Sequence, residues 1–282
     1  MRSVTVIYTT ARYGGINILR DSMRRQTVQP KQIIICDALC DERHAEVANF
    51  MYDMPVLHLP DPPKRPGDYW SLNKAWNRAL ATIDPDTCDI VAILQDYIWL
   101  PNDAIEKFVR RFDDEGDDIA ISGVGNQYAL DQTEVGPIDL QDKLSIWKHY
   151  MPPCGDMTFK DPRLEKRGFF ICNPVEWEAS WACFPTRSAY AIGGFDEDFD
   201  AGWGYDNVNF AERLQLSGCQ IFVDGFNEVR GYSHIRIFEE QAVRDKAPNN
   251  QQLWHRKYRD FHKGSKNWRS GHLHRHFEVM GV

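Results

Sequence analysis

The chain has 282 residues, with 33 Lys or Arg against 41 Asp or Glu, a formal net charge of -8. Hydrophobic residues make up 43% of the sequence, which is enough for a sizeable core and excludes a largely disordered chain. No apolar run reaches the roughly 18 to 20 residues needed to cross a bilayer, so no membrane-spanning segment is expected. The length allows one large α/β domain or two small ones.

Apolar runs of strand length alternate with segments of helical period over the first 120 residues. Several runs are continuous and β-branched, as expected of buried parallel strands, and the predicted strands cover 4–9, 32–37, 55–59, 90–95 and 119–124. One helix is predicted by apolar residues that recur every three or four positions, at Leu72, Ala75, Trp76, Ala79 and Leu80. A second helix shows the same stripe, at Ile105, Phe108, Val109 and Phe112.

This alternation predicts right-handed crossovers and a mostly parallel sheet with helices on both faces. In such sheets ligands bind beyond the carboxyl ends of the strands. The segments in which we expect a binding site are therefore 9–12, 37–39 and 95–97.

The middle of the chain, 126–173, is rich in Pro, Gly and acidic residues and predicts a long functional loop or lid, with one helix over 141–149. Regular patterns then resume, and they predict a strand over 180–185, helices over 186–192 and 206–216, and a strand over 220–223. We accordingly divide the chain into a first half, 1–125, a second half, 126–240, and a tail, 241–282.

Seven cysteines, an odd number, are scattered along the chain. This distribution favours reduced thiols over a disulfide framework, and the spacing does not match the common zinc motifs. The N-terminus shows no signal-peptide cleavage site, since 4–8 already has the pattern of a first strand. We therefore expect a cytoplasmic protein without disulfides.

Asp96 directly follows the predicted strand 90–95, between Gln95 and Tyr97. A carboxylate at that edge suits a hard divalent cation such as Mg²⁺ or Mn²⁺. A single Asp after a strand is also a common turn or cap residue, which is the alternative interpretation.

Two glycine clusters, at 193–194 and 202–204, precede the predicted helix 206–216. Glycine lets the backbone turn sharply and holds Trp203 and Asp206 at the N-terminus of that helix. Asp206 is then either an N-cap or a functional carboxylate, and Trp203 either stacks on a ligand or anchors the core.

Together these segments resemble a glycosyltransferase of the GT-A fold, family 2 type. The resemblance covers about half of the chain and lies in 4–10, 19–27, 33–37, 73–77 and 94–96, in matching order. The segment 185–213 is similar to the acceptor segment shared by galactosyltransferases and polypeptide N-acetylgalactosaminyltransferases, and 249–261 resembles the latter. The fold implied is a Rossmann-like, mostly parallel α/β sheet flanked by helices, with an irregular lid and a C-terminal helical tail.

The resemblance implies a metal-dependent transfer from a nucleotide-diphosphate sugar, most often a uridine nucleotide (UDP), with Mn²⁺ or Mg²⁺. It makes Asp96 and His234 the metal ligands and Asp37 the contact to the nucleoside. The resemblance, together with the position of some residues at the ligand edge of the predicted sheet, predicts a set of nucleotide-sugar contacts. They are Thr9, Thr10, Ala11, Arg12, Asp37, Lys74, Asn77, Gln95 and Asp96. A solvated helix residue is the alternative for Lys74.

The chain departs from the family pattern at two motifs. The usual Asp-x-Asp metal motif is reduced to Asp96 alone, which implies weaker metal binding. Asn207 occupies the position of the inverting base, and an amide cannot take a proton. We therefore predict Asp206 as the catalytic carboxylate, with Asn207 and Trp203 beside it, and leave an inverting or retaining outcome open.

The segment 255–276 contains seven Lys or Arg and one acid, a local charge of +6. A saccharide is the expected acceptor, and this basic tail keeps nucleic acid, including a modified DNA base, as a second option. Two other functions remain open. One is a GT-A shell that binds a carbohydrate or nucleotide sugar without efficient catalysis, and the other is a nucleotidyltransferase.

Overall fold

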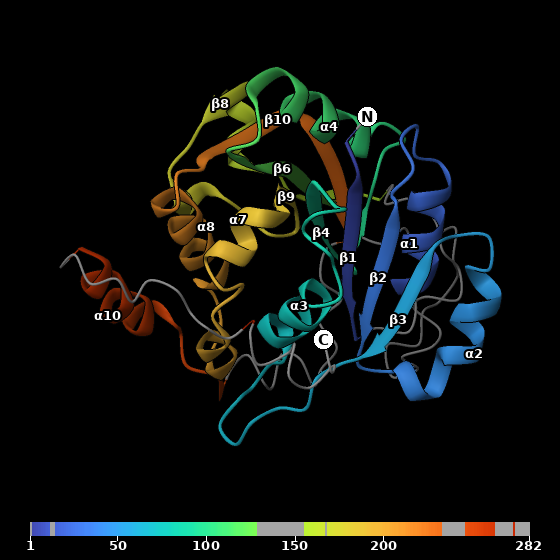
Figure 1. The fold of residues 1–282 in the computed structure, drawn as a ribbon, viewed down its shortest axis with the longest axis horizontal. Helices are drawn as coiled ribbons and strands as arrows, with labels where there is room; N and C mark the ends of the chain where they lie inside the picture. Colours follow the sequence, from blue (N-terminus) through green and yellow to red (C-terminus); the bar gives the residue numbers. More distant parts are fainter. Residues whose placement is uncertain are drawn as a thin grey trace.

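A computed structural model describes residues 2–11, 15–128, 155–166, 168–232, 246–262 and 273, without the side chains of 50 and 258–262. Within these ranges the strands form one mixed sheet in the order β3-β2-β1-β4-β9-β6-β10-β5, with β7 beside β6 and β8 beside β10 (Figure 1). The strands are β1 (Val4–Thr10), β2 (Gln32–Asp37), β3 (Val56–Pro60), β4 (Ile90–Gln95), β5 (Ile98–Trp99), β6 (Ile119–Tyr128), β7 (Met157–Phe159), β8 (Phe169–Ile171), β9 (Trp181–Pro185) and β10 (Gln220–Tyr232).

The helices flank the sheet on both faces, as predicted. They are α1 (Gly15–Arg24), α2 (Cys40–Phe50), α3 (Leu72–Leu80), α4 (Ala104–Glu115), α7 (Thr186–Ala191), α8 (Asp206–Leu216) and α10 (Gln251–His262), with short 3-10 helices η1 (Pro162–Lys166), η2 (Pro174–Glu176) and η3 (Glu197–Ala201). The side chains of α3, α7 and α8 pack in one core, and those of α1, α2 and α4 pack in the other.

Strand periodicity explains the two cores. Along β4, Val91 and Ile93 point into the core with α3, while Ile90, Ala92 and Leu94 point into the core with α4. Because successive strand residues face opposite sides, a continuous apolar run is buried on both. This is why the first-half strands could be recognised from sequence. The predicted strands 32–37 and 90–95 agree with β2 and β4 residue for residue.

The first four strands, β3, β2, β1 and β4, are parallel, and β9 then runs antiparallel to both β4 and β6. Beyond β9, β6 and β10 form a long parallel pair with an irregularity between Asp224 and Glu228. Their carboxyl-terminal halves were not predicted, since polar residues and glycines interrupt the apolar pattern there. The interpretation of 126–173 as irregular is wrong for its described parts, because β7 and β8 pair with the sheet. The helix expected over 141–149 lies outside the described residues.

The six cysteines that the structure describes are buried and form no disulfide with one another. Among the helices in the described ranges, none combines the length and apolar character that a membrane crossing requires. Leu273 is buried in the core beside α3, and its N–H donates to the carbonyl of Gly193 at 3.2 Å. Leu273 of the basic segment 255–276 is therefore packed inside the molecule. Positions 263–272 and 274–276 of that segment lie outside the described residues.

The Gly193-Gly194 turn joins α7 to η3 and is held by two buried polar side chains. Gly194 has φ +73, and a Cβ there would lie 2.3 Å from Oδ1 of Asn77, so the position requires glycine. Asn77 donates to the carbonyl of Phe195 at 2.9 Å and accepts from its N–H at 2.7 Å. Arg213 donates to the carbonyl of Ile192 at 3.1 Å and to that of Gly194 at 2.6 Å.

We expect Arg213→Met to lower the free energy of unfolding by about 2 to 4 kcal/mol, because two buried carbonyls lose their donors while the apolar packing is kept. Urea denaturation measures this change. The matched control is Arg187→Met, since Arg187 and its partner Asp86 are 75% and 81% exposed, and it should cost less than about 1 kcal/mol. Equal effects of the two substitutions would contradict this role of Arg213.

Candidate functional site

Asp96 lies at the carboxyl end of β4, against the end of β1. Its Oδ2 accepts hydrogen bonds from Oγ1 of Thr10 at 3.1 Å and from the N–H of Ala11 at 3.3 Å. A Cβ on Gly15, the first residue of α1, would lie 3.2 Å from Cβ of Asp96, so a larger residue would crowd this corner. The side chain is buried and oriented by backbone and hydroxyl donors, as a ligand for a cation must be.

Asp37, at the end of β2, is connected to the same corner. Arg43 of α2 donates to both carboxylate oxygens of Asp37, at 2.6 and 2.7 Å, and also to Oγ1 of Thr10 at 3.3 Å. Burial alone would raise the pKa of Asp37, but hydrogen bonds from His58 and Arg43 outweigh it and hold the pKa below its ordinary value. The structure thus joins Asp37, Arg43, Thr10 and Asp96 in one polar chain along the carboxyl edge.

A pocket of about 480 Å³ opens beside this corner, and we call it the edge pocket. Gln95 and Tyr97, the neighbours of Asp96, form one wall, and the N-terminal end of α3 forms another. The remaining wall comes from the segments before β9 and before α8. The lining residues include Trp70, Asn73, Trp76, Glu178, Ser180, Asp200, Trp203, Tyr205, Asp206 and Asn207.

The α3 wall is held by Asp200 of η3. Its carboxylate accepts from the N–H and side-chain amide of Asn73, at 3.0 and 2.9 Å, and from the N–H of Lys74 at 3.3 Å. Burial raises the pKa of Asp200 to about 6, although these donors act in the opposite direction. Asp200 therefore caps the N-terminus of α3 from a distant segment.

Asp206 begins α8 and is placed by an unusual backbone conformation. The preceding residue, Tyr205, has φ 66, the one positive value outside glycine in the described part of the chain. A non-glycine residue in this region costs energy, and such conformations concentrate at functional sites. Burial raises the pKa of Asp206, against hydrogen bonds from its own N–H and that of Asn207.

Glu178 is a second carboxylate in the edge pocket. The side-chain amide of Asn207 donates to the carbonyl of Trp177 at 2.8 Å and to Oε2 of Glu178 at 3.3 Å. Desolvation by the surrounding protein raises the pKa of Glu178 to about 7, and the nearby negative charge of Asp206 acts in the same direction. Asn207 cannot take a proton itself, but its amide orients Glu178, whose carboxylate can accept one.

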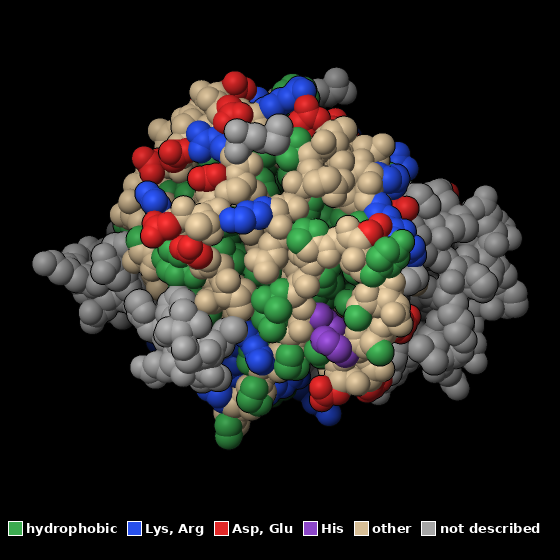
Figure 2. Space-filling model, turned by 45° about the vertical axis from the view of Figure 1, so that its right-hand side comes forward, with side chains coloured by type: hydrophobic (Ala, Val, Ile, Leu, Met, Phe, Trp, Pro, Cys, Tyr) green, Lys and Arg blue, Asp and Glu red, His purple; other side chains and the backbone are tan. Residues whose placement is uncertain are grey.

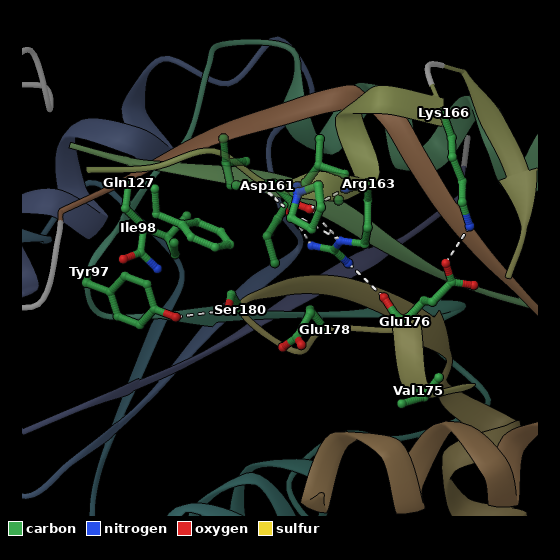
Figure 3. A pocket seen from close by; sticks show the side chains of 17 residues that line it. Tyr97, Ile98, Gln127, Asp161, Arg163, Lys166, Val175, Glu176, Glu178 and Ser180 are labelled. Carbon is green, nitrogen blue, oxygen red and sulfur yellow. Dashed lines mark hydrogen bonds and ion pairs between the residues drawn. The ribbon is translucent and has the colours of Figure 1, made fainter. Parts of the chain in front are cut away.

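Glu178 also lines a second pocket of about 520 Å³, which we call the side pocket (Figure 3). The two pockets share Tyr97, Val175, Glu178 and Ser180. In the side pocket Arg163 donates to both oxygens of Asp161 and to the carbonyl of Glu176, and the Tyr97 hydroxyl hydrogen-bonds to Ser180 at 2.9 Å. Glu178 therefore stands where two cavities meet.

The loop that carries Trp203 is tied to the segment before α10. The N–H of Trp203 donates to the carbonyl of Pro248 at 3.0 Å, and the N–H of Asn250 donates to the carbonyl of Trp203 at 3.1 Å. The ring of Tyr205 stacks on Trp254 of α10, with 5.3 Å between ring centroids. The Trp203 side chain remains 37% exposed and lines the edge pocket, so it is available to a ligand.

Most of the residues predicted from sequence lie together at this edge. Thr10, Ala11, Asp37 and Asp96 belong to the polar chain described above, and Thr9 pairs in register with Gln95, which lines the edge pocket. Asp206, Asn207 and Trp203 line the edge pocket as well. Arg12 and His234 lie outside the described residues. The described part of β10 ends at Tyr232, whose N–H donates to the carbonyl of Tyr97 at 2.9 Å, beside Asp96.

The expectation that Lys74 and Asn77 face the ligand edge is not met by their side chains. Both are buried, and neither lines the edge pocket. Lys74 forms an ion pair with Asp68, and Asn77 donates to Glu197 as well as to Phe195. The physical reason is that the turn at Gly194 and the 3-10 helix η3 pack against α3 and bind the side chain of Asn77, a contact that the sequence could not reveal. Asn73 and Trp76 of the same helix line the pocket instead.

Sequence reasoning missed Glu178 and Asp200. Both lie in segments without a regular pattern, and each is brought to the site by a partner far away in the chain. The possible contact of the basic segment 255–276 with nucleic acid was likewise predicted from its composition alone. Within its described part, Lys257 forms ion pairs with Asp196 and Asp198 and is therefore used inside the molecule.

No protein-family model matches the sequence, and a search of curated proteins found no significant match. Similar solved structures do exist. Mannosyltransferase PcManGT from Pyrobaculum calidifontis, in complex with GDP-Man and Mn²⁺, has a TM-score of 0.56 at 16% identity and covers 100% of this chain and 76% of its own. TarS from S. aureus has a TM-score of 0.50 at 13% identity and covers 86% and 39%.

GalNAc-T7 with UDP, GalNAc and Mn²⁺ has a TM-score of 0.57 at 10% identity and covers 83% of this chain and 44% of its own. The chain thus spans less than half the length of TarS and of GalNAc-T7. At these identities the likeness shows the fold, which is GT-A-like, and confirms the architecture expected from sequence.

Proposed function

We propose that the protein is a glycosyltransferase that uses a nucleotide-diphosphate sugar. The observation that carries this proposal is the carboxylate pair Asp206 and Glu178 in a pocket whose wall is formed by the neighbours of Asp96, at the ligand edge of a GT-A-like sheet. The similar structures of PcManGT and GalNAc-T7 contain a nucleotide or nucleotide sugar together with Mn²⁺. Their chemistry fits the donor groups found at this edge.

The donor set at Asp96 fits a divalent cation. The carboxylate supplies hard oxygen ligands and is oriented by Thr10 and Ala11. We propose Mn²⁺ or Mg²⁺ here, with His234 as a further ligand. When bound, the ion supplies neutralisation of the diphosphate charge. The side chains of Thr9, Thr10, Ala11 and Gln95 would line the donor, with Asp37 and Arg43 beside its nucleoside.

We assign the donor sugar to the edge pocket and the acceptor to the side pocket. The two cavities meet at Glu178, so a hydroxyl that enters from the side pocket would meet Glu178 before it reaches the donor. A carboxylate with a pKa of about 7 is well matched to take a proton at neutral pH. Glu178 is therefore our candidate base. Asp206 would hold the sugar hydroxyls, and Trp203 offers a stacking surface.

Donor binding can be tested without knowing the acceptor. We expect UDP and Mn²⁺ together to raise the melting temperature more than either does alone, because the ion links the diphosphate to Asp96. Thermal denaturation with UDP, GDP, ADP and CDP, each with Mn²⁺ and with EDTA, measures this effect and identifies the base. A purely lectin-like shell would instead respond to saccharides. The absence of any nucleotide-dependent shift would remove the proposal.

A further inference from the structure

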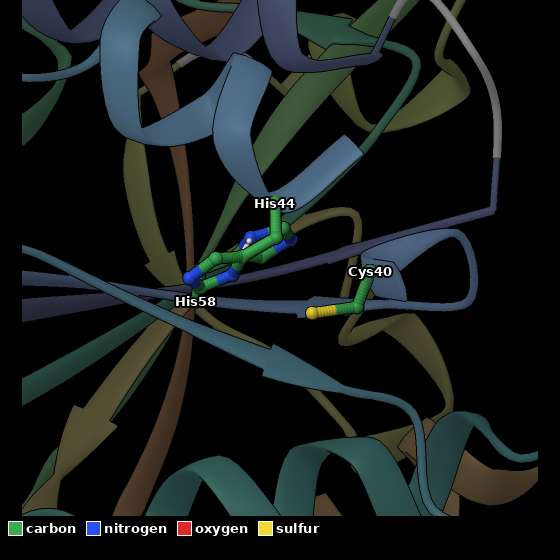
Figure 4. Close-up of side chains that lie close together, drawn as sticks. All are labelled: Cys40, His44 and His58. Atoms are coloured by element: carbon green, nitrogen blue, oxygen red, sulfur yellow. Dashed lines mark hydrogen bonds between the residues drawn. The ribbon is translucent and has the colours of Figure 1, made fainter. Parts of the chain in front are cut away.

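Cys40, His44 and His58 lie close together where the first turns of α2 meet β3, the edge strand of the parallel part of the sheet (Figure 4). Cys40 is the first residue of α2, His44 lies one turn later, and His58 is in the middle of β3. One ligand atom from each residue lies within 4.8 Å of the other two. The sequence spacing did not reveal the cluster, because β3 supplies the third member.

The two imidazole rings meet by their nitrogen edges. Their Nδ1 atoms are 3.1 Å apart, closer than the ring centroids at 5.1 Å, and the ring planes differ by 3°. Tetrahedral zinc with nitrogen and sulfur ligands separates neighbouring ligand atoms by roughly 3.3 to 3.8 Å, given bond lengths of about 2.0 to 2.3 Å. Small side-chain movements would therefore place one ion between the three ligand atoms.

The tautomer of His58 is set by Asp37. Nε2 of His58 lies 2.9 Å from Oδ2 of Asp37, which also forms an ion pair with Arg43. An ionised carboxylate only accepts, so Nε2 carries the proton and Nδ1 of neutral His58 presents a lone pair toward His44. A histidine that binds zinc usually donates its other ring N–H to a carboxylate in this way.

We propose that Cys40, His44 and His58 form a zinc site, with the fourth position open to water. One sulfur and two imidazole nitrogens suit zinc better than Mg²⁺ or Mn²⁺, which favour oxygen. The site is distinct from the cation proposed at Asp96. It is reachable from solvent, since His44 is exposed, and histidine side chains reach the surface on the face shown in Figure 2.

The weak packing of α2 against the sheet indicates that a bound zinc ion would help to hold this helix in place. Among its described side chains, α2 buries only Cys40, Arg43 and Val47, so little apolar contact holds it to the sheet. Zinc would link its first turn to β3. Because His58 also contacts Asp37, the same link would hold the Asp37 carboxylate that Arg43 connects to Thr10. The free energy of zinc binding would thus support the nucleotide edge.

The experiment uses purified full-length protein, stripped with EDTA, dialysed and titrated with Zn²⁺ alone against a chromogenic chelator. We expect one tightly bound ion per chain and a rise in melting temperature of about 5 °C at free zinc about 100-fold above the dissociation constant. Cys40→Ala and His44→Ala should each weaken binding by more than about 100-fold and remove the rise. Wild-type protein that binds no zinc would overturn the site.

Matched controls separate this site from other zinc ligands. His255→Ala, at an exposed position of α10, and a His272→Ala/His274→Ala double variant should keep the bound ion, as should Asp96→Asn. Co²⁺ bound to wild-type protein should show sulfur-to-cobalt charge-transfer absorption, which requires no variant to fold. Zinc binding that survives both ligand substitutions, or a cobalt spectrum without the sulfur band, would refute the assignment.

Discussion

Asp96→Asn is expected to lower sugar transfer by about 10³-fold or more. An amide of the same shape can still accept from Thr10, so the fold is kept, but the negative charge that binds the cation is lost. The rise in melting temperature with UDP and Mn²⁺ together should disappear as well. Release of nucleotide from a panel of nucleotide sugars, with mixed saccharides as acceptors, measures the loss of turnover.

The matched control is Asp103→Asn. Asp103 immediately precedes α4, its side chain is 48% exposed, and it forms an ion pair with Lys107 one turn later. Its replacement should leave turnover within about twofold of wild type, because exposed pairs of this kind contribute little. If Asp96→Asn retained more than a tenth of wild-type turnover, Asp96 could not hold the ion. If wild type and variant were equally inactive toward all donors, the binding-protein alternative would be favoured.

Glu178→Gln is expected to lower kcat by about 10² to 10⁴-fold, the usual contribution of a positioned general base. Asn207 would still meet a polar group of the same size, so binding of the donor should change little. Single-turnover measurement at saturating donor separates this effect on kcat from an effect on KM. Glu165→Gln, at an exposed position of η1, serves as the control and should match wild type.

The pH dependence distinguishes a base from a merely structural carboxylate. Desolvation by the surrounding pocket and the nearby charge of Asp206 raise the pKa of Glu178 to about 7, although the residue is exposed to solvent, and the base acts in its ionised form. The rate of wild type should therefore rise with pH until about 7 and then level off, while the Glu178→Gln variant lacks this rise. A wild-type profile without a group near 7, or the same rise in the variant, would assign the proton to another residue.

The first half of the fold was predictable because its signals are local. The strand β2 is apolar over 33–36 and β4 over 90–94, and in α3 and α4 the apolar stripe repeats over two or more turns. A parallel sheet also brings the carboxyl ends of its strands to one edge. Asp37, Thr10 and Asp96 could therefore be placed in one region from the positions of three strand ends.

In the second half, local patterns were sufficient for β9, α7, α8 and the start of β10, which were expected over 180–185, 186–192, 206–216 and 220–223. Helix α8 starts at Asp206 as expected, and the Gly193-Gly194 turn is present. The extensions of β6 and β10 were missed because each strand is stabilised by the other, not by its own apolar pattern. Asn77 was expected to contact the nucleotide sugar, but its side chain binds the backbone of Phe195. That partner lies 118 residues away in the chain, so the local sequence could not reveal it.

Sequence by itself determined the alternation of strands and helices, the ligand edge of the sheet and the candidates Asp96 and Asp206, since each depends on residues close together in the chain. Only the tertiary structure decided that Glu178 joins Asp206 in one pocket, that Asn207 holds it, and that His58 meets Cys40 and His44. These contacts depend on crossovers and loop paths. Their geometry follows from the packing of the whole sheet, which no local pattern records.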